Sequence, residues 1–228
     1  MYKILLALFI TLPIWADFFP KTTTTTIKSV SDNGIVLNKP LAKVGMSCAI
    51  IHNYGNNINA LIAMGKQTSP NGSVKLIDSD IVHHDSIPTI NTKPKVGDKV
   101  IGGYLYNNLL LIAPNEKTYT ELTSKYHKKW IHPDLFAMFL SQEGDATPTK
   151  ESLKGFAKRY QIGLVMIVKQ NNIILYDPLS QNVISSKSYK NSNSDAKYPF
   201  YMHFKEIESG WFSSNKDGNY YKTMEQFK

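Results

Sequence analysis

Cysteine and arginine are nearly missing from the sequence. Cys48 is the single cysteine among 228 residues, so no disulfide can form within the chain. Of the 26 lysines and arginines, only Arg159 is an arginine. Base-specific recognition of nucleic acid relies on the bidentate guanidinium group. The composition therefore predicts a fold held together by its apolar core. It also argues against a nucleic-acid partner, although the formal net charge is +8.

Long apolar runs are also scarce, and the one candidate lies at the N-terminus. Lys3 precedes the apolar stretch 4–12, which is followed by Pro13 and the small residue Ala16. The stretch is shorter than the roughly 20 residues that cross a bilayer. The order of its parts is typical of a secretory signal peptide, and the alternative is an N-terminal membrane anchor. We expect residues 1–16 to be a signal peptide. The mature chain would then carry no transmembrane segment and would be exported to the periplasm or to the cell surface.

Residues 17–113 have the pattern of a β-rich lobe. The five threonines at 22–26 favour a strand over a low-complexity linker, because β-branched residues prefer extended backbone. Turn signals at 32–34 and 69–72 separate short apolar runs. Several short strands at close spacing predict a small N-terminal β-barrel-like unit. The last two strands of this lobe are expected to form a pair that turns at Asn107-Asn108.

Residues 114–228 predict a second lobe of helices and strands, which we expect to form one compact unit with the first lobe. Asn115 is suited to cap one helix, Pro133 to begin a second, and Thr147-Pro148 to open a third. The apolar run 164–168 predicts a strand buried on both faces. Two more strands are expected over 173–176 and 183–189. The predicted class is therefore α+β, with a small N-terminal β-barrel-like unit followed by helices packed on an antiparallel β-meander.

No group of residues predicts catalysis or metal binding. Cys48 and His52 would lie about 13 Å apart on a strand, at roughly 3.3 Å per residue, which is too far for proton transfer. His127 and His132 do not have the i, i+4 spacing of a helical zinc pair, and His83-His84 point to opposite sides of an extended chain. We therefore expect a protein without catalytic residues, metal or cofactor that is not an enzyme. The alternative is an enzyme of unrecognised type.

Aromatic pairs near the C-terminus are candidates for partner binding. Trp211-Phe212 and Tyr220-Tyr221 each follow a glycine-containing turn, and aromatic residues on loops often anchor a partner. The alternative is that they cover the core of the second lobe. Lys228, the last residue, presents an ammonium group and a carboxylate together.

A family resemblance covers most of the chain after the leader. It is carried by 96–98, by 107–108 before Leu111-Ile112-Ala113-Pro114-Asn115-Glu116, and by 134–140, and it continues through 163–168, 199–200 and Gly210. These residues resemble the N-terminal domain of the plasminogen-binding protein A family of exported proteins. The resemblance implies an exported envelope protein that binds other proteins. It also implies binding of host plasminogen, whose kringles take C-terminal lysines.

These observations favour a non-enzymatic, exported protein–protein interaction module. We expect it to be a periplasmic structural component of a cell-envelope assembly such as the flagellar motor, with other envelope proteins as partners. The alternative is a surface-exposed protein that binds plasminogen through Lys228.

Overall fold

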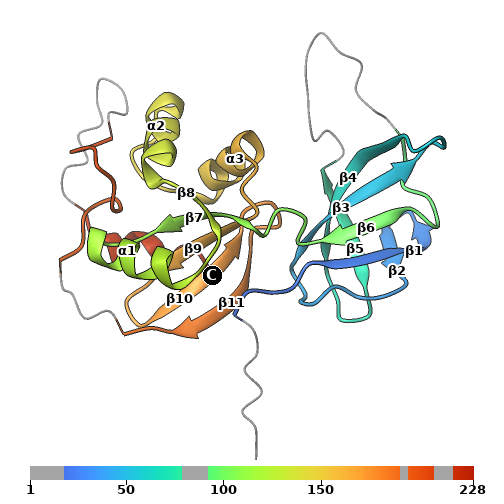
Figure 1. Ribbon diagram of the computed structural model, residues 1–228, viewed down its shortest axis with the longest axis horizontal. Helices are drawn as coiled ribbons and strands as arrows, with labels where there is room; N and C mark the ends of the chain where they lie inside the picture. The colour runs from blue at the N-terminus through green and yellow to red at the C-terminus, as the bar shows by residue number, and fades with distance from the viewer. Residues whose placement is uncertain (1–17, 79–91, 191–194, 208–217) are drawn as a thin grey trace, which may run out of the picture.

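The computed structural model describes residues 18–78, 92–190, 195–207 and 218–228. The predicted signal peptide lies outside these residues. Within them, the chain forms two lobes that lie side by side, a β-barrel and a mixed sheet covered by helices (Figure 1). The structure is β-rich with four short helices among the described residues, consistent with the predicted α+β class. None of these helices is long and apolar enough to span a membrane.

The first lobe is a closed antiparallel barrel with strand order β1-β2-β5-β4-β3-β6. β1 closes it by pairing with β6, where Thr23 lies opposite Gly102. The threonine-rich segment is therefore a strand rather than a linker. The strands are β1 (Thr23–Ser31), β2 (Gly34–Leu37), β3 (Ser47–Asn53), β4 (Asn59–Gln67), β5 (Ser73–Asp78) and β6 (Lys99–Gly102).

Small and β-branched side chains fill the barrel. Ile27, Cys48, Ile50 and Val100 are completely buried inside it. The walls approach so closely that a β-carbon at Gly65 would lie 2.5 Å from the Val74 side chain. The barrel interior is therefore a packed core rather than a ligand cavity.

The second lobe is built on a five-stranded sheet with the order β11-β10-β9-β7-β8. β9, β10 and β11 form the antiparallel meander that the sequence predicted. β7 runs parallel to both β8 and β9, which makes the sheet mixed. The strands are β7 (Asn108–Ile112), β8 (Lys129–Ile131), β9 (Leu164–Val168), β10 (Asn172–Asp177) and β11 (Asn182–Ser188).

The predicted strand pair that turns at Asn107-Asn108 is wrong. β6 pairs with β1 and β3 in the barrel, whereas β7 pairs with β8 and β9 in the other sheet. The chain therefore passes from the barrel to the second sheet between β6 and β7, through residues 103–107. The sequence instead predicts the boundary between the lobes at residue 114. The physical reason is that both strands take partners far away in sequence, so a local turn signal does not fix their pairing.

In the described part of the chain, four short helices lie around the second sheet. The Asn115 side chain accepts a hydrogen bond from the Thr118 amide at the start of α1, and Gly144 ends α2 in the left-handed conformation, as predicted. Thr149 caps α3 in a capping box with Ser152. The helices are α1 (Glu116–Lys125), α2 (Pro133–Glu143), α3 (Lys150–Tyr160) and α4 (Tyr220–Met224).

Alternate residues of the central strands face two different cores. In β9, Leu164 and Met166 pack with the barrel interior and with Leu122 of α1, while Val165 and Ile167 pack with α2, α3 and α4. β9 is thus buried on both faces, as its apolar run predicted. Because one apolar cluster runs from the barrel into the sheet, the two lobes share a core.

Candidate functional site

A buried carboxylate joins the two lobes. Asp177, at the end of β10, accepts hydrogen bonds through Oδ2 from the Ser47 amide at 2.8 Å and from the Tyr106 hydroxyl at 2.5 Å. Its Oδ1 accepts hydrogen bonds from the amides of Leu179 and Ser180 at 3.0 and 3.1 Å. Ser47 begins barrel strand β3, and Tyr106 lies in the connection between the lobes. One carboxylate therefore fixes the barrel, the connection and the sheet relative to one another.

Burial sets the protonation of this joint. It raises the pKa of Asp177, against the lowering effect of hydrogen bonds from Tyr106, Ser47 and Ser180. The pKa of Tyr106 is also raised well above its ordinary value, first by burial and then by the Asp177 charge. Tyr106 therefore stays a neutral donor to the carboxylate. The joint is a structural element, because both groups are enclosed away from solvent.

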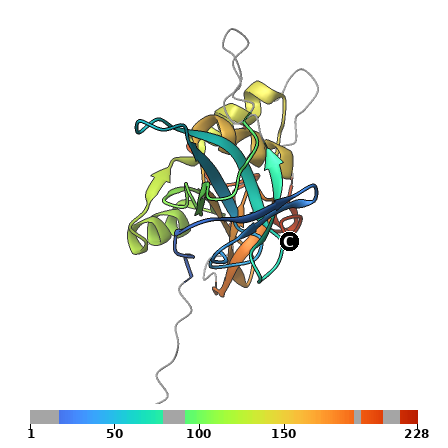
Figure 2. The same ribbon diagram turned by 90° about the vertical axis from the view of Figure 1, so that its right-hand side faces the viewer.

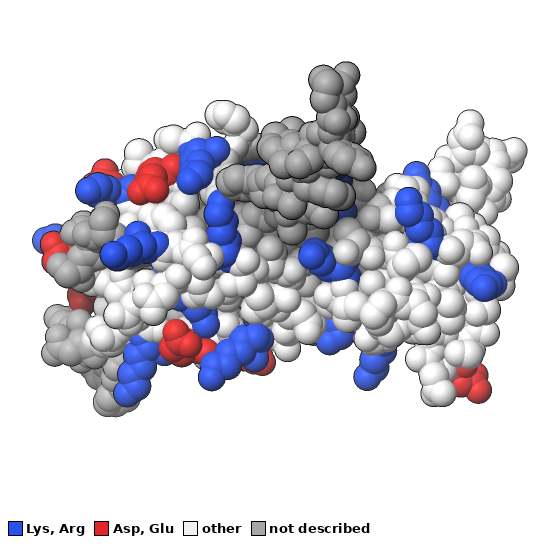
Figure 3. Space-filling view, turned by 90° about the horizontal axis from the view of Figure 1, so that it is seen from below, with Lys and Arg blue, Asp and Glu red and all other residues white. Residues whose placement is uncertain are grey.

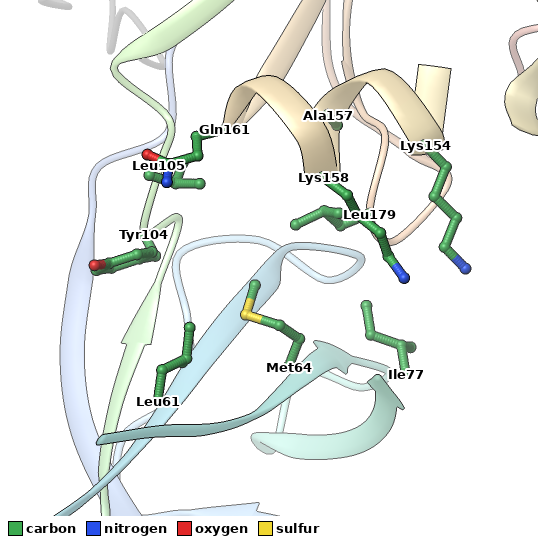
Figure 4. Close-up of a pocket in the computed structure, with 10 residues that line it drawn as sticks. All are labelled: Leu61, Met64, Ile77, Tyr104, Leu105, Lys154, Ala157, Lys158, Gln161 and Leu179. Carbon is green, nitrogen blue, oxygen red and sulfur yellow. The ribbon is translucent and has the colours of Figure 1, made fainter. Parts of the chain in front are cut away.

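A small apolar pocket lies between the lobes (Figure 4). Leu61 and Met64 line it from the barrel, Ala157 lies on α3, and Lys154 and Lys158 of α3 extend beside the opening. Its volume is about 180 Å³. Pockets for drug-sized ligands usually measure about 300–1,000 Å³. The pocket is therefore better suited to a single apolar side chain of a partner than to a cofactor.

The end of the barrel away from the second lobe faces the viewer in Figure 2. Several elements of the barrel carry exposed apolar residues. Their side chains come from the β1–β2 and β3–β4 ends of the barrel, from β5 and from the segment before β6. We call this surface the distal barrel face. Its residues and their exposed fractions are Val30 (47%), Tyr54 (47%), Ile58 (61%), Leu76 (37%) and Val96 (67%).

Local contacts connect the residues of the distal barrel face. Val30 and Leu76 line one shallow hollow together with Pro94. The Tyr54 amide donates to the Ile58 carbonyl at 2.9 Å, and the Tyr54 hydroxyl is hydrogen-bonded to Thr92 at 2.5 Å. The contacts form two groups, one at Pro94 and one at Thr92, and these two residues are close neighbours in the chain. Clustered exposed apolar residues of this kind mark interaction sites more often than isolated ones do.

Lysines surround the distal barrel face. Asp32 lies near it as an exposed acid, while Asp98 is buried and paired with His52 at 2.6 Å. Figure 3 shows the excess of basic over acidic side chains on one side of the barrel. The surface therefore suits a partner that is apolar in the centre and acidic around it. The exposed lysines of these barrel segments are Lys28, Lys75, Lys93, Lys95 and Lys99.

The candidate partner-binding residues that the structure describes differ in their surroundings. Tyr220 is buried, and its hydroxyl lies 2.9 Å from the Ile112 carbonyl oxygen and 2.7 Å from that of Val168. Tyr221 is half-buried and packs edge-on against Tyr220. The proposed contact role of Tyr220 is therefore wrong, because its ring and hydroxyl are used inside the second lobe. Trp211 and Phe212 lie outside the described residues.

Lys228 is exposed, but the chain before it is held to the fold. Phe227 is buried against Tyr176, with the ring centres 5.3 Å apart, and the Gln226 side chain donates to the Pro148 carbonyl. The lysine therefore stands at the surface of the second lobe, next to buried residues.

Two groups of residues were not predicted from the sequence. The distal barrel face combines strand residues Val30 and Leu76 with residues of a turn and of the segment before β6, and only the closed barrel brings these elements together. His132 and Asp134 meet His203, and the one nitrogen of each imidazole and the carboxylate oxygen lie within 4.8 Å of one another. From the sequence, His132 is compared only with the nearby His127, and no local signal links His132 to His203.

No curated protein and no solved structure shows a significant match to the chain. A family model described as the N-terminal part of plasminogen-binding protein pgbA matches residues 22–227. The match covers both lobes and confirms the resemblance that the sequence motifs indicated. The chain therefore belongs to the family of plasminogen-binding protein pgbA N-terminal domains.

Proposed function

We propose that this chain is a non-enzymatic protein-binding module that acts outside the cytoplasm, and that the distal barrel face binds an acidic surface of another envelope protein. The observation that carries the proposal is the set of five exposed apolar residues on barrel segments that also carry exposed lysines. Apolar contacts would supply affinity, and the lysines would steer the acidic partner. The family description also names a protein as the binding partner of its members.

Rigid coupling of the lobes supports a structural role in an assembly. The Asp177 joint and the shared core hold the barrel in one orientation on the sheet. A preorganised surface loses little conformational entropy on binding. The predicted signal peptide points to the periplasm, where the flagellar motor is a suitable host assembly.

The second candidate is plasminogen binding at the cell surface. The family description and the exposed Lys228 favour it. Under this hypothesis the Lys228 side chain enters a kringle. Lys228 lies on the second lobe, so the two candidates use different surfaces and respond to different variants.

Site-specific crosslinking in the native host tests the proposed docking face. A photoreactive amino acid at position 58 is expected to crosslink to a defined envelope protein, whereas the same group at position 138 is not. The Tyr54→Ser/Val96→Ser variant should abolish the crosslink from position 58. Met138→Ser/Phe204→Ser is the matched control, because Met138 and Phe204 are also exposed apolar residues but lie on the second lobe. Unchanged melting temperatures would show that both variants fold.

Several outcomes would overturn the proposed surface. Equal crosslinking from positions 58 and 138 would reject it, as would a crosslink that survives the Tyr54/Val96 variant. Higher salt should weaken the interaction because the lysines take part.

Plasminogen binding is measured separately with immobilised plasminogen. Loss of binding on deletion of Lys228 or on addition of a lysine analogue, with no effect of the Tyr54/Val96 variant, would favour the second candidate.

A further inference from the structure

Three side chains from distant segments meet on the surface of the second lobe. His132 caps the start of α2, and Asp134 lies in the first turn of that helix. His203 belongs to a segment 69 residues later. We propose that His132, Asp134 and His203 bind a divalent transition-metal ion, with zinc as the best match. This site is independent of the distal barrel face.

The donor set and its spacing suit zinc. Two imidazole nitrogens and one carboxylate oxygen are typical zinc ligands, with bonds of about 2.0–2.2 Å, so ligand atoms around a tetrahedral ion lie about 3.3 Å apart. Asp134 Oδ2 lies 3.3 Å from His132 Nδ1 and 2.8 Å from His203 Nδ1. A metal ion would replace the proton between Asp134 and His203 and, at His132 Nδ1, the hydrogen bond that this nitrogen accepts from the Asp134 amide at 3.2 Å.

The backbone of the cluster is preorganised. The His203 amide donates to Asp134 Oδ1 at 2.8 Å. The Lys197 ammonium donates to the carbonyls of Met202 at 2.7 Å and Phe204 at 2.5 Å, which holds the backbone on both sides of His203. The imidazole rings of His132 and His203 are stacked with 4.7 Å between their centres and 4° between their planes, so one ring must rotate before both nitrogens point at one ion. Binding therefore requires a side-chain rotation but little new ordering of the backbone.

The expected role of the ion is to fasten the segment around His203 to the start of α2. Three protein ligands leave room for water in the remaining coordination position. The Tyr201 hydroxyl, 3.1 Å from His203 Nε2, orients the ring as outer partners of metal-bound histidines do. A zinc ion here would join two segments that the fold otherwise connects through hydrogen bonds and packing.

Zinc titration of tag-free protein by isothermal calorimetry tests the proposal. We expect one zinc ion per chain with micromolar affinity, and a loss of at least about tenfold in affinity for His203→Ala. His132→Asn provides a second variant, because asparagine can still cap α2 while the imidazole ligand is lost. His52→Ala is the matched control: His52 also pairs with an aspartate, Asp98, but no second histidine joins that pair in the described residues.

Thermal unfolding gives an independent readout. Zinc should raise the melting temperature of the wild type and of His52→Ala, and should not raise that of His203→Ala. The proposal is overturned if the wild type binds no zinc, if His203→Ala and His132→Asn bind it as tightly as the wild type, or if His52→Ala loses it equally. In those cases the cluster is a hydrogen-bonded contact only.

Discussion

The amide of Ser47 donates a 2.8 Å hydrogen bond to Oδ2 of Asp177, so the first residue of β3 in the barrel is tied to the last residue of β10 in the second sheet. The two residues are 130 positions apart. Their contact is buried, and Tyr106 shares the same carboxylate oxygen. This side chain, satisfied by four donors, therefore helps the shared core to hold the lobes in one orientation.

Replacement of this carboxylate should destabilise the protein. In Asp177→Asn, the remaining carbonyl oxygen can accept from Leu179 and Ser180, but the new amide group would face the Ser47 N–H, which is also a donor. We expect a loss of about 1–3 kcal/mol in the free energy of unfolding, measured with urea at neutral pH. Ser180→Ala is the control. It keeps the backbone donor and removes a hydroxyl with no hydrogen-bond partner among the described residues. An equal loss in both variants would contradict the assigned role.

The difference in unfolding free energy between the wild type and Asp177→Asn should depend on pH. Burial raises the pKa of Asp177 above 3.8, so the folded state holds this proton more tightly than the unfolded state does. The stability of the wild type relative to Asp177→Asn should increase as the pH falls through the raised pKa towards 3.8, and should be constant below that value. A difference that decreases over this range would show that the hydrogen bonds outweigh burial.

Gly163→Ala should be among the more damaging single substitutions. A β-carbon at position 163 would lie 2.1 Å from the Leu105 carbonyl oxygen, which belongs to the backbone of the connection and cannot rotate away. We expect a loss on the order of 3 kcal/mol in unfolding free energy. In the control, Gly155→Ala, the new methyl would meet only the ring edge of Phe139 at 3.2 Å, and alanine favours the helix. A Gly163→Ala protein as stable as the control would show that the connection is not packed as described.

Tyr220→Phe should affect stability rather than partner binding. It removes a buried hydroxyl that lies between the carbonyls of Ile112 and Val168, and the expected cost is about 1–2 kcal/mol. Tyr104→Phe, at a half-exposed ring, should cost much less. Chemical unfolding and the crosslink from position 58 should be measured on the same preparations. If binding is lost while stability is unchanged, Tyr220 is a contact residue after all.

Local signals in the sequence predicted much of the fold. Asn115 and Gly144 act at helix ends through hydrogen bonds or backbone conformation within a few residues, so their effect can be read without the tertiary structure. The apolar run of β9 likewise predicted burial on both faces. These features depend on spacing along the chain, which the sequence contains.

Long-range pairing was harder to predict. β6 and β7 were assigned to one pair because a turn signal separates them, but their partners lie in different sheets. β8 was missed, because its three residues, Lys129–Ile131, are too few to show an alternating pattern.

The candidate sites show the same limit. Val30 and Leu76 line one hollow only after the barrel closes, and His203 reaches Asp134 only after the second lobe has folded. The sequence therefore predicts a binding module without locating its surface, and it predicts no metal site, whereas the structure brings His132, Asp134 and His203 together.

The single sulfhydryl in this chain has a practical consequence. Cys48 is buried within the barrel, and its burial raises the pKa of the thiol to about 12. Such a group is almost entirely uncharged at neutral pH and reacts slowly with oxidants. The Cys48 thiol of the folded protein should therefore stay unchanged whatever the redox state of its surroundings. Bacterial cytoplasm should yield the same protein as an oxidising compartment, without oxidative refolding and without covalent dimers.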